Sequence, residues 1–226
     1  MKNFQQNNPP LLLCLDLINT LLLRDNKQFT KVFIDTLVKF GITNLNMEQT
    51  SNRIREKYLE YSLGNYHDDA DYLRSILLYY VDSVEANQIA EILIPHLLEH
   101  FYPMDSYKDF LDYCFGKYKL VLASNFVEDW AKQLLDKFNM SHYFERIYVS
   151  SSLRFRKPAK EFYLAILNDY SDIKKGDFLV IGDSIINDYH GSKKLGMQAI
   201  LFDNKKAKEY YHQSFRLNFE QIKQII

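Results

Sequence analysis

Residues 179–197 have the sequence LVIGDSIINDYHGSKKLGM, in which a short apolar run ends at the polar triplet Gly182–Ser184. The run Phe178–Ile181 is too short for a helix and apolar throughout, which is typical of a strand buried on both faces of a sheet. Residues Tyr189–Leu195 have helical spacing, and Gly196 stands where a helix stop is expected. A strand, a polar turn and a helix in this order predict one unit of a parallel α/β sheet.

Four further apolar runs of strand length lie along the chain, at Leu11–Leu15, Lys119–Ala123, Arg146–Val149 and Gln198–Phe202. Helical spacing recurs between them, at Glu128–Phe138 and Lys160–Asn168. Because a connection between parallel strands needs a crossover, usually a helix, this alternation predicts an α/β fold with a parallel sheet.

A long helical stretch separates the first predicted strand from the others. It contains four amphipathic segments, Phe29–Phe40, Gln49–Tyr61, Ala70–Val81 and Val84–His100. A fifth helical segment, Ser106–Phe115, leads directly into the strand at Lys119 and is assigned to the sheet. We therefore predict a helical subdomain at residues 24–102, inserted into a sheet domain made of residues 1–23 and 103–226.

Composition excludes several classes of protein. The 226 residues are 47% hydrophobic and 25% charged, which is ordinary for a globular chain and excludes disordered and fibrous proteins. The net charge of -1 offers no basic patch for nucleic acid or for an anionic membrane, so neither is expected as a partner. No heptad or exposed apolar run points to a protein partner, and the oligomeric state is left open.

Cysteine usage and the leucine-rich start bear on location. Cys14 and Cys114 lie far apart and form no CxxC or Cys/His spacing, so we expect buried thiols in a reducing compartment and a cytoplasmic protein. The apolar stretch Leu11–Leu23 is interrupted by Asp16 and Asn19, and it is shorter than the roughly 20 residues that span a bilayer. We expect neither a signal peptide nor a membrane anchor.

Polar side chains follow four of the predicted strands. In chain order they are Asp16, the pair Ser124-Asn125, Lys157, and Asp183 with Asp188. Any one of them has an ordinary structural explanation, as a helix cap, a turn residue or a solvated charge. Because ligands bind at the carboxyl ends of strands in open parallel sheets, their joint placement indicates a single site.

The charges of this expected site suggest its chemistry. Asp16, Asp183 and Asp188 would repel one another unless a hard divalent cation lay among them, and carboxylate ligands suit Mg²⁺. Lys157 can neutralise a phosphate oxygen while Ser124 donates to another, as phosphoryl transfer requires. Asp16 would be the nucleophile and form an aspartyl phosphate.

Four motifs in this order resemble those of the haloacid dehalogenase superfamily of hydrolases. They are LLLCLDLINTL at 11–21, LVLASN at 120–125, RKPAKEFY at 156–163, and the stretch at 179–197. The resemblance covers nearly the whole chain after residue 10. It implies a Rossmann-like core with a helical cap between the first and second motifs.

The resemblance also implies roles for particular residues. Asp16 would be the nucleophile, with Lys157 as its catalytic partner. The substrate-binding set would be Thr20, Ser124, Asn125 and Lys157. Mg²⁺ would be held by Asp16, the backbone carbonyl of Ile18, Asp183 and Asp188.

The sequence departs from the superfamily pattern at three positions. Phosphatases of the superfamily usually have a second aspartate, the general acid/base, at the position of Ile18. Loss of such a group typically lowers the rate by about 10² to 10⁴. Asn19 and Arg154 stand where glycine is usual, and we expect Asn19 to preserve the turn because asparagine tolerates positive φ.

Three functions follow from these observations. The first is a Mg²⁺-dependent phosphatase acting on a small phosphorylated metabolite, with a helical subdomain that selects the substrate. The alternative is a phosphate-binding protein of the same fold with little or no turnover. A lesser alternative is hydrolysis of a C–X bond, as in 2-haloacid dehalogenases, which also lack the second aspartate. The identity of the substrate is left open.

Overall fold

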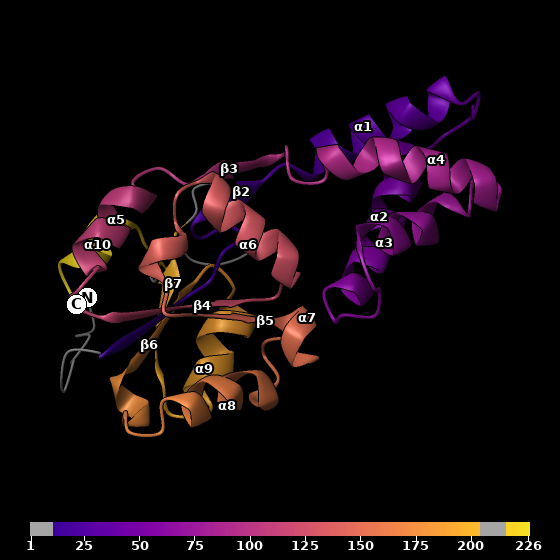
Figure 1. Cartoon of the computed structure of the whole chain (residues 1–226). Coiled ribbons are helices and arrows are strands. Elements are labelled where there is room, and N and C mark those ends of the chain that lie inside the picture. Colours follow the sequence, from indigo (N-terminus) through magenta and orange to yellow (C-terminus); the bar gives the residue numbers. More distant parts are fainter. Residues whose placement is uncertain (1–10, 204–215) are drawn as a thin grey trace.

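The computed structural model describes residues 11–203 and 216–226, and its centre is a six-stranded parallel sheet (Figure 1). The strand order is β5-β4-β1-β6-β7-β8, and every neighbouring pair is parallel. The strands are β1 (Leu12–Leu15), β4 (Lys119–Ser124), β5 (Arg146–Val149), β6 (Phe178–Gly182), β7 (Gln198–Phe202) and β8 (Arg216–Leu217). The predicted α/β fold with a parallel sheet is confirmed.

Both faces of the sheet are covered, because successive side chains of a strand point to opposite sides. Leu13 and Leu15 of β1 belong to one apolar cluster, while Leu12 and Cys14 belong to the other. The first cluster includes residues of α5 (Tyr107–Cys114), α6 (Glu128–Lys137) and α10 (Phe219–Lys223). The second is built largely by α8 (Lys160–Asp169). Two-sided burial explains why the strands are continuously apolar.

Four helices lie together to one side of the sheet (Figure 1, indigo to magenta). They are α1 (Asn26–Lys39), α2 (Met47–Tyr61), α3 (Asp69–Leu77) and α4 (Ser83–Leu93). Each begins with an Asp or Asn cap whose side chain accepts from backbone N–H groups, at Asp25, Asn46, Asp68 and Asp82. We refer to these helices as the α1–α4 group.

The chain enters and leaves the α1–α4 group through a short antiparallel pair of strands. β2 (Leu22–Arg24) pairs with β3 (Phe101–Pro103), with Arg24 opposite Phe101. Sequence analysis missed both strands, because three residues show no periodicity.

Two predicted helices end earlier than expected. The segment Val84–His100 leaves the α-helix at Leu93, and Pro95 lies in the short 3₁₀ helix Ile94–His96. Proline has no N–H and its ring clashes with the preceding turn, so the α-helix does not continue through it. Ala70–Val81 is helical only to Leu77.

The remaining short elements connect the layers. They are the 3₁₀ helices Ser141–Tyr143 and Lys175–Asp177, α7 (Ser150–Leu153), the π-helix Ile185–His190 and α9 (Gly191–Lys193). Helical structure after β6 therefore begins at Ile185, four residues before the predicted Tyr189.

The division into residues 1–23 with 103–226, and 24–102, stays a prediction. Residues 1–10 and 204–215 of the expected sheet domain lie outside the described residues. In the part of the chain that the structure describes, no helix has the length and apolar character needed to cross a bilayer.

Candidate active site

The sheet topology brings the residues of the expected site to one edge. Asp16 directly follows the central strand β1, Ser124 ends its neighbour β4, and Asp183 follows β6 on the other side. These residues line a cleft of about 140 Å³ together with Ile18, Asn125, Arg156, Lys157 and Asp188. The clustering expected at the carboxyl ends of the strands is thus present in the structure.

Lys157 is the centre of the hydrogen-bond network. Its Nζ donates to Asp16 Oδ1 at 2.8 Å, to Asp188 Oδ1 at 2.5 Å and to the carbonyl oxygen of Ala123 at 2.7 Å. The residue is only 4% exposed. Burial alone lowers the pKa of the Lys157 ammonium, but the two carboxylates outweigh it and raise that pKa above its ordinary range. The ammonium therefore stays charged at neutral pH.

The two carboxylate oxygens of Asp16 have different hydrogen-bond partners. Oδ1 accepts from Lys157 and from the Ser124 hydroxyl, the latter at 2.9 Å. Oδ2 has only the Thr20 hydroxyl, at 3.4 Å, among the described residues. With Oδ1 engaged by two donors, Oδ2 is the oxygen better placed to attack an electrophile.

Asp188 lies in the π-helix that follows β6. Its Oδ2 accepts from the Ser184 N–H at 3.0 Å, and its backbone carbonyl accepts from the Ser192 hydroxyl at 2.5 Å. A Cβ atom on Gly182 would overlap the Asp188 carboxylate, so only glycine fits the last position of the strand. Asp188 is 1% exposed and is therefore not a solvated charge.

Asp183 and Asp188 both have a pKa above the ordinary range of a carboxyl group. Burial, followed by the charges of Asp16 and Asp188, raises the pKa of Asp183 to about 7. Burial is also the main cause that raises the pKa of Asp188. One oxygen from each of Asp16, Asp183 and Asp188 lies within 4.8 Å of the others. Since Lys157 balances only one of three negative charges, this set of oxygen donors fits a divalent cation such as Mg²⁺.

Asn125 holds the loop that carries Lys157. Its Oδ1 accepts from the Lys157 N–H at 2.7 Å, and its Nδ2 donates to the Lys157 carbonyl oxygen at 2.9 Å. The following peptide bond, Lys157–Pro158, is cis. Sequence analysis assigned Asn125 to substrate binding. In the structure, the oxygen and the nitrogen of its side-chain amide both form hydrogen bonds with the backbone of Lys157.

The two positions where glycine is usual both have left-handed backbone. Asn19 has φ 64° and Arg154 has φ 61°. The expectation that Asn19 preserves the turn is therefore confirmed. Ile18 lines the cleft next to it, and the described cleft residues include no carboxylate beyond Asp16, Asp183 and Asp188 and no imidazole.

Contacts from the α1–α4 group to this edge of the sheet were missed by sequence analysis. Arg156, half-buried in the cleft wall, donates to the Ser62 hydroxyl, and Arg154 donates to the Gly64 carbonyl oxygen. The Trp130 indole N–H donates to Asp69 Oδ1 at 2.6 Å. Each pair joins residues at least 60 positions apart. No local pattern marks such a contact.

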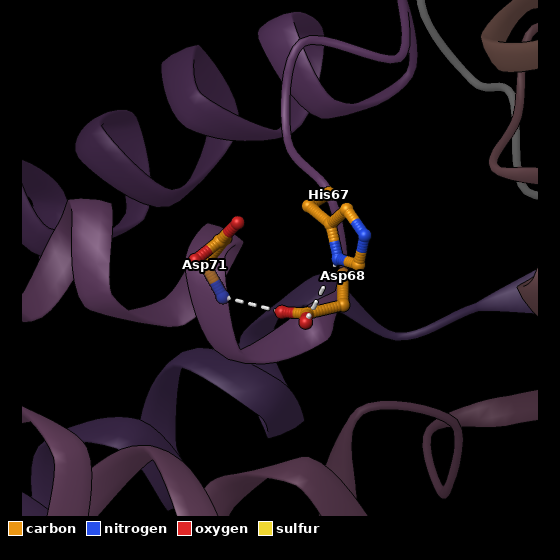
Figure 2. A group of neighbouring side chains, drawn as sticks. All are labelled: His67, Asp68 and Asp71. Carbon is orange, nitrogen blue, oxygen red and sulfur yellow. Dashed lines mark hydrogen bonds and ion pairs between the residues drawn. The ribbon is translucent and has the colours of Figure 1, made fainter.

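A second set of potential metal ligands lies at the start of α3 and consists of His67, Asp68 and Asp71 (Figure 2). Asp68 Oδ1 accepts from the Asp71 N–H at 2.8 Å and caps α3, and its Oδ2 lies 3.2 Å from His67 Nδ1. Asp71 also pairs with Arg74. These exposed side chains hold the start of a helix, which explains their proximity without a metal.

Comparison with known protein families agrees with the motifs and with this geometry. The family model for haloacid dehalogenase-like hydrolases matches residues 16–202. The chain belongs to this family. The match begins at Asp16 and includes all of the cleft residues described above. Among curated proteins, none matches the sequence significantly.

Solved structures of the haloacid dehalogenase-like fold align over nearly the whole chain. YfnB from Bacillus subtilis, a HAD-hydrolase bound to magnesium, is 17% identical, with a TM-score of 0.68 and 96% of this chain and 99% of that one covered. A HAD phosphatase from Thermococcus onnurineus is 15% identical, with a TM-score of 0.63 and coverage of 96% and 97%. A 2-haloacid dehalogenase from Pseudomonas syringae pv. Tomato DC3000 is 19% identical, with a TM-score of 0.71 and coverage of 94% and 96%. At these identities the likeness shows the shared fold.

Proposed function

We propose that this haloacid dehalogenase-like hydrolase is a Mg²⁺-dependent phosphatase that acts on a small phosphorylated metabolite. The observation that carries the proposal is the arrangement of Asp16, whose Oδ1 is held by Lys157 and Ser124 while Oδ2 has one long contact within the described part of the chain. An anchored carboxylate with one available oxygen suits in-line attack on phosphorus.

The proposed reaction has two steps. Asp16 Oδ2 forms a bond to phosphorus, the bond to the leaving oxygen breaks, and that oxygen takes a proton from water. A water molecule then attacks the phosphorus of the aspartyl phosphate and loses its proton to solvent; the bond between phosphorus and Asp16 Oδ2 breaks, which releases inorganic phosphate and regenerates the Asp16 carboxylate. Both half-reactions conserve charge without any redox partner.

The chain's own residues have distinct roles in this proposal. Lys157 compensates negative charge beside the phosphoryl group, Ser124 and Thr20 orient the Asp16 carboxylate, and Asn125 positions Lys157. Asp16, the Ile18 carbonyl, Asp183 and Asp188 would hold Mg²⁺, with Asp16, Asp183 and Asp188 already close together. When bound, the cation neutralises charge on the phosphoryl oxygens.

Ile18 limits the range of substrates. With no carboxyl group at this position, the leaving oxygen must depart without protonation by a positioned side chain. We therefore expect acyl phosphates and aryl esters, whose leaving groups are acidic, to be hydrolysed faster than alkyl esters.

The free, buried cysteines Cys14 and Cys114 fit a reducing compartment such as the cytoplasm.

Phosphate release in the presence and absence of Mg²⁺ tests the proposal. Asp16→Asn removes the nucleophile but not the fold, so we expect release to fall at least about 10³-fold. Asp35→Asn is the matched control, because Asp35 is exposed on α1, and we expect wild-type rates from it. Release that is equal in wild type and Asp16→Asn would show that Asp16 is not the nucleophile.

Two alternatives are distinguished by the residue at position 18. If the protein binds phosphate with little turnover, wild type is slow and Ile18→Asp gains activity by supplying an acid/base. Ile18 also adds apolar surface to the cleft wall, which favours an organic halide as a second candidate substrate. Halide release from 2-haloacids without Mg²⁺ would support that candidate and contradict the phosphatase.

A further inference from the structure

A second, smaller cavity lies in the α1–α4 group, between β2 and helices α1 and α2. Its volume is about 60 Å³, and its wall includes Arg24, Asn26, Ser51, Arg55 and Tyr58. Its lining, as far as the described residues form it, contains no carboxylate. Among the described residues, neither Arg24 nor Arg55, which is exposed, forms an ion pair, so no carboxylate balances the charge of either lining arginine.

Arg24 is fixed with its guanidinium between aromatic rings. The guanidinium carbon lies 4.6 Å from the centre of the Tyr58 ring and 5.5 Å from that of Phe101. Its Nε donates to His100 Nε2 at 3.3 Å. These contacts use only one of the five guanidinium N–H groups in a hydrogen bond, and they restrict the side chain to the cavity wall.

Neutral donors complete the lining. The side chains of Asn26 and Ser51 make no hydrogen bond to another described residue. Arginine does not deprotonate in proteins, so both lining arginines keep their positive charge. A bound anion would compensate that charge and could accept hydrogen bonds from guanidinium groups.

We propose that this cavity binds the anionic group of a small oxyacid, a carboxylate or a phosphate. Two sources share that chemistry, namely the far end of a substrate whose phosphate lies at Asp16, and a free anion. The first source rests on the proposed phosphatase function. Tyr58 connects the two sites, because it lines the cavity and its ring centre lies 6.3 Å from that of Phe126, which directly follows the cleft residue Asn125.

Isothermal titration of inorganic phosphate in the presence of Mg²⁺ counts the sites. We expect wild type to bind two phosphate ions per chain, one at the cleft and one in the cavity. Arg55→Gln removes one of the two guanidinium groups and should weaken the second site about ten- to a hundredfold. Arg55→Glu should abolish it, because the new carboxylate pairs with Arg24. Lys31→Gln removes the same charge from an exposed position on α1 and should leave both sites.

Phosphonates that carry a carboxylate at increasing distance distinguish the two sources. If the cavity takes the far end of a substrate, one member of the series binds at least tenfold tighter than an alkyl phosphonate, and Arg55→Gln removes that gain. If a free anion is the ligand, no member shows a gain while the second phosphate still binds. Unchanged stoichiometry and affinity of phosphate in both Arg55 variants would overturn the proposal. Turnover that does not need Asp16 would instead refute the phosphatase function and leave this result standing.

Discussion

Gly182 is the residue on which the geometry of the cleft depends most directly. It ends β6, and the Asp188 carboxylate occupies the space where a Cβ would lie. We expect Gly182→Ala to lower the free energy of unfolding by about 1–3 kcal/mol, because overpacking displaces the carboxylate. Gly176→Ala is the matched control, since nothing lies near its Cβ position. Urea denaturation of both variants tests this; equal stabilities would mean that Asp188 moves aside freely.

His100 should make the stability of the protein depend on pH. Burial and the charge of Arg24 lower the pKa of His100 from 6.5 to about 3. Between these values only the unfolded chain takes up the proton, so stability falls as the pH drops below about 6.5, by at most about 1.4 kcal/mol per pH unit. The raised pKa of Asp183 acts in the opposite sense, because it favours the folded state as the pH falls. This contribution is the same in wild type and in the variants.

The variant His100→Phe isolates this contribution. The ring of His100 already stacks on Phe29 and packs against Phe101, so a phenyl ring suits the site. We expect the stability of His100→Phe to fall less than that of wild type between pH 7 and pH 5, in urea titrations at each pH. His67→Gln, at an exposed position, should follow wild type. Identical slopes for wild type and His100→Phe would refute the assignment.

The positions of some residues of the candidate site could be predicted from the sequence, and those of others could not. Asp16, Ser124 and Asp183 were predictable because each directly follows or ends an apolar run, and parallel topology fixes where such ends meet. The two hydrogen bonds between Asn125 and the Lys157 backbone were not predictable, because they join residues 32 positions apart in the chain.

At the scale of elements, Asp69 connects helix α3 to helix α6. Its Oδ1 accepts from the Tyr61 hydroxyl at 2.7 Å and from the Trp130 indole at 2.6 Å. We expect Asp69→Ala to lower the free energy of unfolding by about 1–3 kcal/mol, because two poorly solvated donors lose their acceptor. Asp71→Ala removes a charge from the same first turn and should cost less than about 1 kcal/mol, since its pair with Arg74 is partly exposed. Equal losses by thermal or urea unfolding would contradict this role.

Helix and strand boundaries show which elements were predictable. β5 and β7 match their predicted ranges, because continuous apolar runs mark buried strands clearly. β2 and β3 were not predicted. Each has only three residues and pairs with a segment far away in the chain, so neither has a local sequence signal. The early end of α4 could have been predicted from Pro95, because proline has no N–H and disfavours continuation of an α-helix.

At the scale of the whole molecule, the pairing of β2 with β3 allows a direct test of the predicted division. Arg24 lies opposite Phe101, so residues 25–100 can be replaced by Asn-Gly, which favours a two-residue hairpin turn. We expect the shortened chain to unfold cooperatively by circular dichroism, because the sheet keeps helices on both faces. Its midpoint should be lower, since Phe126 and Trp130 lose their aromatic partner Tyr58. A shortened chain without a cooperative transition would show that the sheet does not fold alone.

The central place of β1 has a consequence for how the protein is made. Leu12 pairs with Lys119 on one side and with Phe178 on the other. On the ribosome, Phe178 follows Leu12 by 166 residues, which is on the order of ten to thirty seconds of synthesis. During that time the leucine-rich first strand has no complete set of partners, and its apolar side chains are open to chaperones or to aggregation. The strand that is synthesised first is thus the one whose folding must wait longest.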